Sequence, residues 1–143
     1  MGDPYNLQRF IEAQDPGYRK IIIELKTGQK YGHWMWYIFP QIEGLGESAM
    51  SRRYAIASRA EAEAYLEHPL LGLRLRECTQ LVLNVEGHSI GHIFHYPDDL
   101  KFRSCMTLFE DASRDGDVFR DALLKYFGGI PDQLTLDILK KRY

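Results

Sequence analysis

The segment from His33 to Gly46 carries the side chains best suited to bind a ligand. Both tryptophans of the chain, Trp34 and Trp36, lie within it, and a proline and two glycines follow them. Aromatic faces stack on bases, sugars or cations, and proline and glycine interrupt a helix with a loop. We therefore predict that this segment forms the wall of a pocket, with Trp34 and Trp36 contacting the ligand. The alternative is that both tryptophans belong to the core and that the glycines only make a turn.

Small and polar residues around the tryptophans fit the same interpretation. Gln41 offers a donor and an acceptor that could orient a ligand. Gly44 and Gly46 allow backbone amides to approach a ligand closely, although their spacing matches neither a phosphate-binding P-loop nor a dinucleotide fingerprint. We predict that Gln41, Gly44 and Gly46 bind the ligand. His33, beside the first tryptophan, is a candidate catalytic residue.

Two arginines form a second candidate group. Arg74 and Arg76 are two positions apart, so a helix directs them to different sides. An inward-facing arginine needs a carboxylate partner, or it awaits an anionic ligand. We predict both arginines as ligand-binding residues. The alternative is that each forms an internal ion pair with an aspartate or glutamate.

A third group is the row formed by Asp98, Lys101, Ser104 and Thr107, which a helix places along one face. A carboxylate, an ammonium and hydroxyls together could hold a phosphate or transfer a proton, and a lysine near a serine is a known nucleophile pairing. We predict Asp98, Lys101 and Ser104 as catalytic candidates, and Lys101 and Thr107 as ligand-binding candidates. The alternative is that the aspartate caps the helix, the lysine pairs with it and the hydroxyls bond to the backbone.

The remaining histidines and the cysteines do not predict a metal centre. His88, His92 and His95 would share one face of a continuous helix and could bind Zn²⁺ or Ni²⁺. Neighbouring glycines weaken that helix, and no glutamate completes a helical metalloprotease motif. Cys78 and Cys105 are far apart and are expected to be buried free thiols. We expect no metal and no cofactor.

Helices are expected to position these groups. Asp3-Pro4 and Asp15-Pro16 each provide a cap and a first-turn proline, and the second helix should end at Gly28. Residues 32–37 could form a short helix, and Ser58 to Glu61 is a capping box. Further helices are expected from Ser58 to His68, Leu70 to Asn84 with a weak point at Gly72, Pro97 or Asp98 to Ala112, Asp117 to Tyr126, and Pro131 to Lys140.

No stretch alternates with a period of two for long enough to form a sheet. The expected fold is a compact all-α bundle of about seven or eight helices, with an aromatic loop punctuated by proline and glycine. At 143 residues, the chain (1–143) should form a single domain with a real core.

Composition narrows the class of partner. The formal net charge is −2 and no block of like charge is present, so broad attraction to nucleic acid or anionic membranes is not indicated. The chain has no apolar run long enough to span a bilayer and no signal-peptide pattern. We therefore expect a cytoplasmic protein.

Several segments resemble the signature blocks of an uncharacterised family, the domain of unknown function 1810 (DUF1810). These are HWMWYIFPQIEGLGES, YLEHPLLGLRLREC and DDLKFRSCMTLF, together with FIEAQ and DQLTL near the two ends. The resemblance covers nearly the whole chain and implies a small, soluble, largely helical protein, but it carries no catalytic assignment. His95 stands where members often have glycine, which argues against a family-wide metal role for it. Some relatives are labelled calpastatin, but this sequence contains nothing similar to the short calpain-binding repeats.

The candidate groups together predict a small anionic ligand with a ring, such as a nucleotide or an ADP-ribose-like molecule. A tryptophan would stack on the base, while arginine, lysine and glycine amides would hold phosphate. Hydrolysis of that ligand, assisted by Asp98 or His33, is a further hypothesis, and the sequence leaves open whether the protein is an enzyme. The alternative function is a non-enzymatic interaction module that grips a partner protein through its Trp- and Phe-rich patch.

Overall fold

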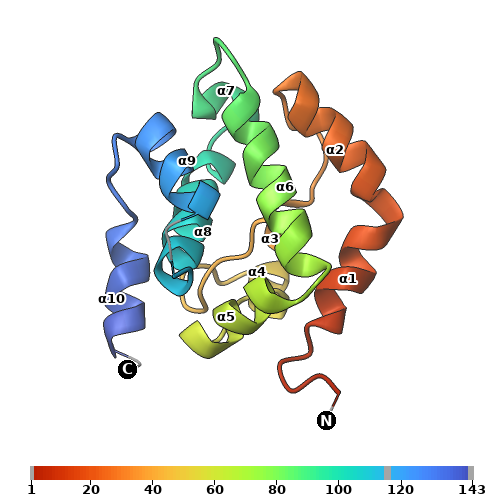
Figure 1. The fold of residues 1–143 in the computed structure, drawn as a ribbon, viewed down its shortest axis with the longest axis vertical. Coiled ribbons are helices and arrows are strands. Elements are labelled where there is room, and N and C mark those ends of the chain that lie inside the picture. The colour runs from red at the N-terminus through yellow and green to blue at the C-terminus, as the bar shows by residue number, and fades with distance from the viewer. Residues whose placement is uncertain (1, 115–116, 142–143) are drawn as a thin grey trace.

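The computed structural model describes residues 2–114 and 117–141, and within them α-helices and one 3-10 helix, η1, enclose a hydrophobic core (Figure 1). The elements are α1 (Gln8–Gln14), η1 (Asp15–Gly17), α2 (Tyr18–Thr27), α3 (Met35–Ile38), α4 (Ala49–Arg53), α5 (Arg59–Glu67), α6 (Leu71–Asn84), α7 (Ile90–Phe94), α8 (Asp98–Ala112), α9 (Asp117–Phe127) and α10 (Gln133–Lys141). The predicted all-α class is confirmed. Every helix in the described residues is too short or too polar to cross a bilayer.

The two longest helices, α6 and α8, organise the domain. Helix α6 packs against α2, α5 and α9, and α8 packs against α5, α7, α9 and α10. An aromatic cluster lies where α8 meets the segments that end α3 and α7. Phe94 and Phe102 stack with their ring centroids 4.9 Å apart, and Phe39 meets both edge-on. Such edge-to-face pairs add to the free energy that their buried area already contributes.

Helix boundaries follow the predicted caps in part. Asp15 does not cap α2, because residues Asp15–Gly17 form η1 and α2 begins at Tyr18 with no side-chain hydrogen bond at its N-cap, Gly17. Gly28 ends α2 in the left-handed conformation (φ +80°), as predicted. Helix α1 begins at Gln8 rather than at Pro4, because the carboxylate of Asp3 accepts the amides of Leu7 and Gln8 ahead of the first turn. The short helices α4 and α7 were not predicted, since five residues give too little apolar periodicity to detect.

The capping box at the start of α5 forms in a modified way. Ser58 accepts the amide of Glu61, as predicted, but the Glu61 carboxylate reaches the amide of Ala57 instead of that of Ser58. The same carboxylate pairs with Arg9 at 2.9 Å. The N-terminus of α5 is therefore tied to α1, which explains why a charged residue that is only 4% exposed is tolerated there.

The turn between α5 and α6 depends on a histidine and a glycine. His68 Nδ1 accepts the amides of Leu70 and Leu71 at 3.1 and 3.2 Å, so it caps the start of α6. A Cβ at Gly72 would lie 2.1 Å from the carbonyl oxygen of Leu66. Gly72 is thus required where the two helices meet, and α6 continues through it without a break.

Candidate functional site

The two tryptophans occupy contrasting environments at the start of α3. Trp34 is only 3% exposed, and its indole N–H donates to Glu24 Oε1 at 3.0 Å. The same oxygen accepts the amides of Tyr31 and Gly32. Burial alone would raise the pKa of Glu24, but these donors and nearby Lys30 outweigh it and hold that pKa below its usual value. Trp34 therefore belongs to the packed core together with a buried carboxylate.

Trp36 has an unsatisfied hydrogen-bond donor. Its indole nitrogen is closed to solvent and has no acceptor within the described residues. The ammonium of Lys101 lies 5.2 Å from the ring centroid, over one face of the ring. Because buried N–H groups are nearly always paired in folded proteins, this donor marks a place where an acceptor is missing.

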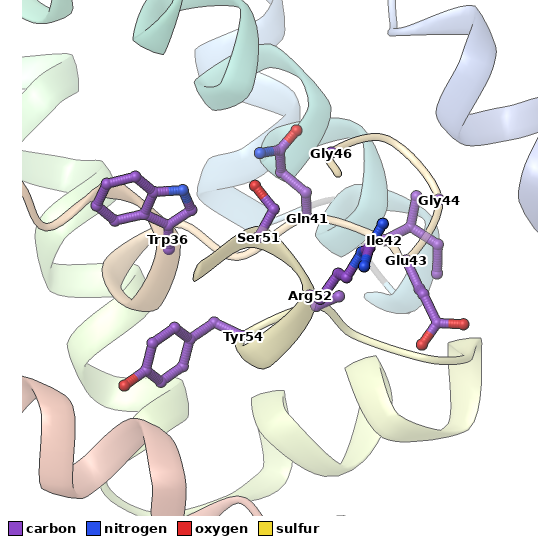
Figure 2. Close-up of a pocket in the computed structure, with 10 residues that line it drawn as sticks. Trp36, Gln41, Ile42, Glu43, Gly44, Gly46, Ser51, Arg52 and Tyr54 are labelled. Atoms are coloured by element: carbon purple, nitrogen blue, oxygen red, sulfur yellow. The ribbon is translucent and has the colours of Figure 1, made fainter. Parts of the chain in front are cut away.

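A pocket adjoins Trp36 (Figure 2). It is formed by Trp36 of α3, the loop that follows α3, and α4 with the residues just after it, and it includes three of the other predicted residues, Gln41, Gly44 and Gly46. In Figure 2 the indole nitrogen is on the side of the ring that faces Gln41 and Ser51. The pocket thus unites four residues that the sequence predicted as ligand contacts.

The loop that closes the pocket is held at both ends. A parallel bridge pairs Ile42 with Ile56, so the loop leaves and rejoins the core at fixed points. Gly44 adopts φ +108°, which favours glycine. A Cβ at Gly46 would lie 2.5 Å from the hydroxyl oxygen of Ser51, so only glycine allows the loop to approach α4 this closely. The glycines therefore shape the pocket, whereas their predicted contact with a ligand stays a prediction.

The pocket is small. Its cavity volume is about 30 Å³, which is room for about two water molecules. All empty space between the lining atoms, including the open mouth, amounts to about 340 Å³. A whole nucleotide does not fit inside, so the interior suits one polar group of a ligand whose remainder lies at the mouth.

Hydrogen-bond donors dominate the polar lining. Ser51 Oγ accepts from Ser48 Oγ at 2.9 Å, which leaves its own proton available to the pocket. Within the described residues the carboxamide of Gln41 makes no hydrogen bond, and the guanidinium of Arg52 has neither an ion-pair partner nor an acceptor. The Glu43 carboxylate points away from Trp36, Gln41 and Ser51 in Figure 2. The lining therefore favours a ligand rich in acceptors.

Arg74 and Arg76 lie outside this pocket, and each has a carboxylate partner. Arg74 Nη1 pairs with Asp15 at 2.8 Å and covers the ring of Tyr18. Arg76 Nε pairs with Asp117 at 2.7 Å. Both arginines therefore form ion pairs within the chain, which is the alternative to ligand binding that the sequence left open.

The predicted row on α8 divides into two parts. Asp98 Oδ2 pairs with buried Lys30 at 2.8 Å, whereas Asp98 Oδ1 is 3.5 Å from Lys101. Ser104 and Thr107 lie further along α8 and bind Asp132 instead. Ser104 Oγ donates to Asp132 Oδ2, and Thr107 Oγ1 accepts the Asp132 amide at 2.8 Å. These two hydroxyls attach the segment before α10, and only Lys101 of this row contacts Trp36.

The other chemically active side chains do not converge on the pocket. His33 is exposed. His88 and His92 stack with centroids 4.2 Å apart, while His95 lies beyond the short α7. Residues 2–114 and 117–141 contain no group of three His, Cys, Asp or Glu side chains that could hold one metal ion.

Both cysteines are buried free thiols, as expected. Burial raises the pKa of Cys78 to about 12 and raises that of Cys105 well above 9.0. Neither thiol therefore has the thiolate character that nucleophilic catalysis requires.

Sequence reasoning did not predict the other six lining residues, among them Ser51, Arg52 and Tyr54. These three lie on or next to α4, a helix of five residues with no apolar periodicity. The one available signal was the spacing of Ser48 and Ser51, in which the first side chain accepts the amide of the second. That pattern indicates a helix start, and it would have directed attention to the residues just after the glycine loop.

Comparison with known proteins supports the family resemblance. The family described as "Protein of unknown function (DUF1810)" matches residues 4–139. The fold is similar to the crystal structure of the conserved hypothetical protein Rv1873 from Mycobacterium tuberculosis, with a TM-score of 0.95 and 52% identity over 96% of this chain and 99% of that one. No curated protein matches the chain. With the family match spanning the pocket loop, α4 and nearly every helix around them, the chain belongs to the DUF1810 family.

Proposed function

We propose that the protein binds a small acceptor-bearing ligand in the pocket beside Trp36. The observation that carries this proposal is the buried, unpartnered indole N–H of Trp36. Leaving such a donor unpaired costs about 1–3 kcal/mol, and a ligand acceptor would recover that free energy. The class predicted from sequence, a small anionic molecule such as a nucleotide or ADP-ribose-like compound, agrees with the donor-rich lining.

The geometry changes the role proposed for tryptophan. Lys101 covers one face of the Trp36 ring, and the edge that carries the nitrogen faces the pocket. Trp36 therefore serves as a hydrogen-bond donor more readily than as a surface on which a base stacks. Because the nitrogen is closed to solvent, neighbouring atoms must shift for a ligand acceptor to reach it.

Binding is better supported than hydrolysis. Asp98 is paired with two lysines, and the single Ser104 hydroxyl proton has two acceptors within 3.2 Å, Asp132 Oδ2 and the carbonyl of Leu100. A serine nucleophile needs an adjacent base that can take its proton, and neither Lys101 nor His33 makes a hydrogen bond to Ser104. The alternative of an interaction module requires exposed tryptophans, but Trp34 is buried and Trp36 is half-buried.

Thermal denaturation with added ligands tests the proposal. AMP, ADP-ribose, NAD and adenosine are suitable probes, each compared in the wild type, Trp36→Phe and Trp34→Phe. Ligand at about 100 times its Kd stabilises the folded state by about 2.7 kcal/mol, a shift of several degrees for a domain of this size. We expect at least one probe to shift the wild type and Trp34→Phe, and to shift Trp36→Phe much less. Equal shifts in all three proteins, or no shift with any probe, would contradict the proposal.

A further inference from the structure

Arg52 is the charged group that the pocket leaves without a partner. It lies in the last turn of α4, and its guanidinium extends toward the loop of Ile42 and Gly44 in Figure 2. Within the described residues no carboxylate lies within ion-pair distance of it, whereas Arg9, Arg59, Arg74 and Arg76 all have one. An arginine at a pocket wall with no carboxylate partner is placed to receive an anion from outside.

The other cation near the pocket is already neutralised. Lys101 and Lys30 share Asp98, and Lys30 also lies close to Glu24, which its charge helps to keep ionised. Two lysines and two carboxylates therefore balance within this group. Glu43 also lines the pocket, but no carboxylate of the described residues lies within ion-pair distance of Arg52, so the unpaired cation lies at the α4 side of the pocket and not at Lys101.

We propose that Arg52 holds an oxyanion, a carboxylate or phosphate group of the ligand, while the ligand's neutral part reaches toward Trp36. This inference rests on the proposed function and specifies its ligand class. The guanidinium offers a planar fork of donors that matches two oxygens of such a group. Ser51, with its proton available, lies between Arg52 and Trp36 in Figure 2 and extends the same set of donors.

Isotope labelling of tryptophan provides a direct test. The chain contains two tryptophans, so a proton–nitrogen spectrum contains two indole signals, which Trp34→Phe assigns. Trp36 reports on the pocket, and Trp34, bonded to Glu24, serves as an internal reference. Titrations with AMP and with uncharged adenosine compare the same ring with and without the anion. Titrations with inorganic phosphate and with acetate distinguish the phosphate class from the carboxylate class.

The matched variants are Arg52→Gln and Arg53→Gln, which change the net charge equally. Arg53 is not one of the lining residues, and its guanidinium lies over the ring of Tyr54, which is one. We expect the anions to move the Trp36 signal in the wild type and Arg53→Gln, and to bind Arg52→Gln about tenfold or more weakly. Added salt should weaken the wild-type interaction, because an exposed arginine is screened.

The outcomes separate the two proposals. If adenosine moves the Trp36 signal as strongly as AMP, or if Arg52→Gln binds the anions as well as the wild type, the role of Arg52 is wrong and the pocket remains. If the anions bind Arg53→Gln and Arg52→Gln equally weakly, the effect is one of net charge, which also overturns the role of Arg52. If no probe moves the Trp36 signal of the folded protein, the pocket proposal fails and this inference fails with it.

Discussion

Replacing each tryptophan in turn by phenylalanine should have opposite consequences for the hydrogen-bond energy. Trp34→Phe removes a donor from a buried carboxylate that accepts it at 3.0 Å. Hydrogen bonds to charged groups contribute about 1.5–3 kcal/mol, and loss of the larger ring adds about 1 kcal/mol of lost burial. We therefore expect Trp34→Phe to lower the free energy of unfolding by about 3 kcal/mol.

Trp36→Phe removes a donor that has no acceptor. The variant recovers about 1–3 kcal/mol by losing a buried unpaired N–H, which offsets about 1 kcal/mol of lost burial and of contact with Lys101. The expected change in the free energy of unfolding lies between zero and a small gain. Lys101 remains paired with Asp98 in this variant, so no new unpaired charge is created.

Urea unfolding of the three proteins under identical conditions measures these changes, provided that the dependence of free energy on urea is the same for all. Thermal midpoints give a second measure, with about 2–4 °C for each kcal/mol in a domain near this size. If Trp36→Phe destabilises the protein as much as Trp34→Phe, the Trp36 N–H has an acceptor in solution. The principal observation behind the pocket would then be refuted.

Three further predictions follow from single contacts. Folding lowers the pKa of Glu24, so the ionised carboxylate stabilises the fold fully above its ordinary pKa of about 4.5, and this stabilisation is lost as the pH falls through the pKa of the folded state. The difference in the free energy of unfolding between wild type and Glu24→Gln, measured with urea, should therefore become smaller in acid and stay unchanged in alkali. Gly72→Ala should destabilise the fold by about 3 kcal/mol because its Cβ meets the Leu66 carbonyl. Gly91→Ala should be neutral or slightly stabilising, because its Cβ would lie no closer than 3.9 Å to any neighbour, and equal effects of the two variants in denaturation would refute the close approach at Gly72. Cys78 and Cys105 should resist thiol reagents at neutral pH until urea unfolds the chain, and fast modification of the folded protein, seen by mass spectrometry, would disprove their burial.

The sequence predicted those parts of the structure that local rules determine. The caps at Gly28 and Ser58 and the span of α8 follow from residue types within one or two helical turns. The contribution of the glycine loop to a pocket was also predictable, since glycine types at fixed spacing indicate close backbone approach. The assignment of partners was not predictable. Arg76 pairs with Asp117 across 41 positions of the chain, and only the folded topology brings them together.

The same limitation explains why two tryptophans two residues apart could not be distinguished from sequence. One path of contacts connects them: Glu24 accepts from Trp34, Lys30 lies over Trp34 and pairs with Asp98, and Asp98 holds Lys101 over Trp36. The contact of Lys30 with Asp98 and that of Lys101 with Trp36 join segments that are distant in sequence and meet only in the fold. The path satisfies the indole of Trp34 and secures one face of Trp36, yet it supplies no acceptor for the second indole. One buried indole is thus fully paired, while the other is left unpaired beside a donor-rich cavity. The unpaired N–H costs free energy of folding that packing alone does not explain, and such unfavourable local features are characteristic of binding sites.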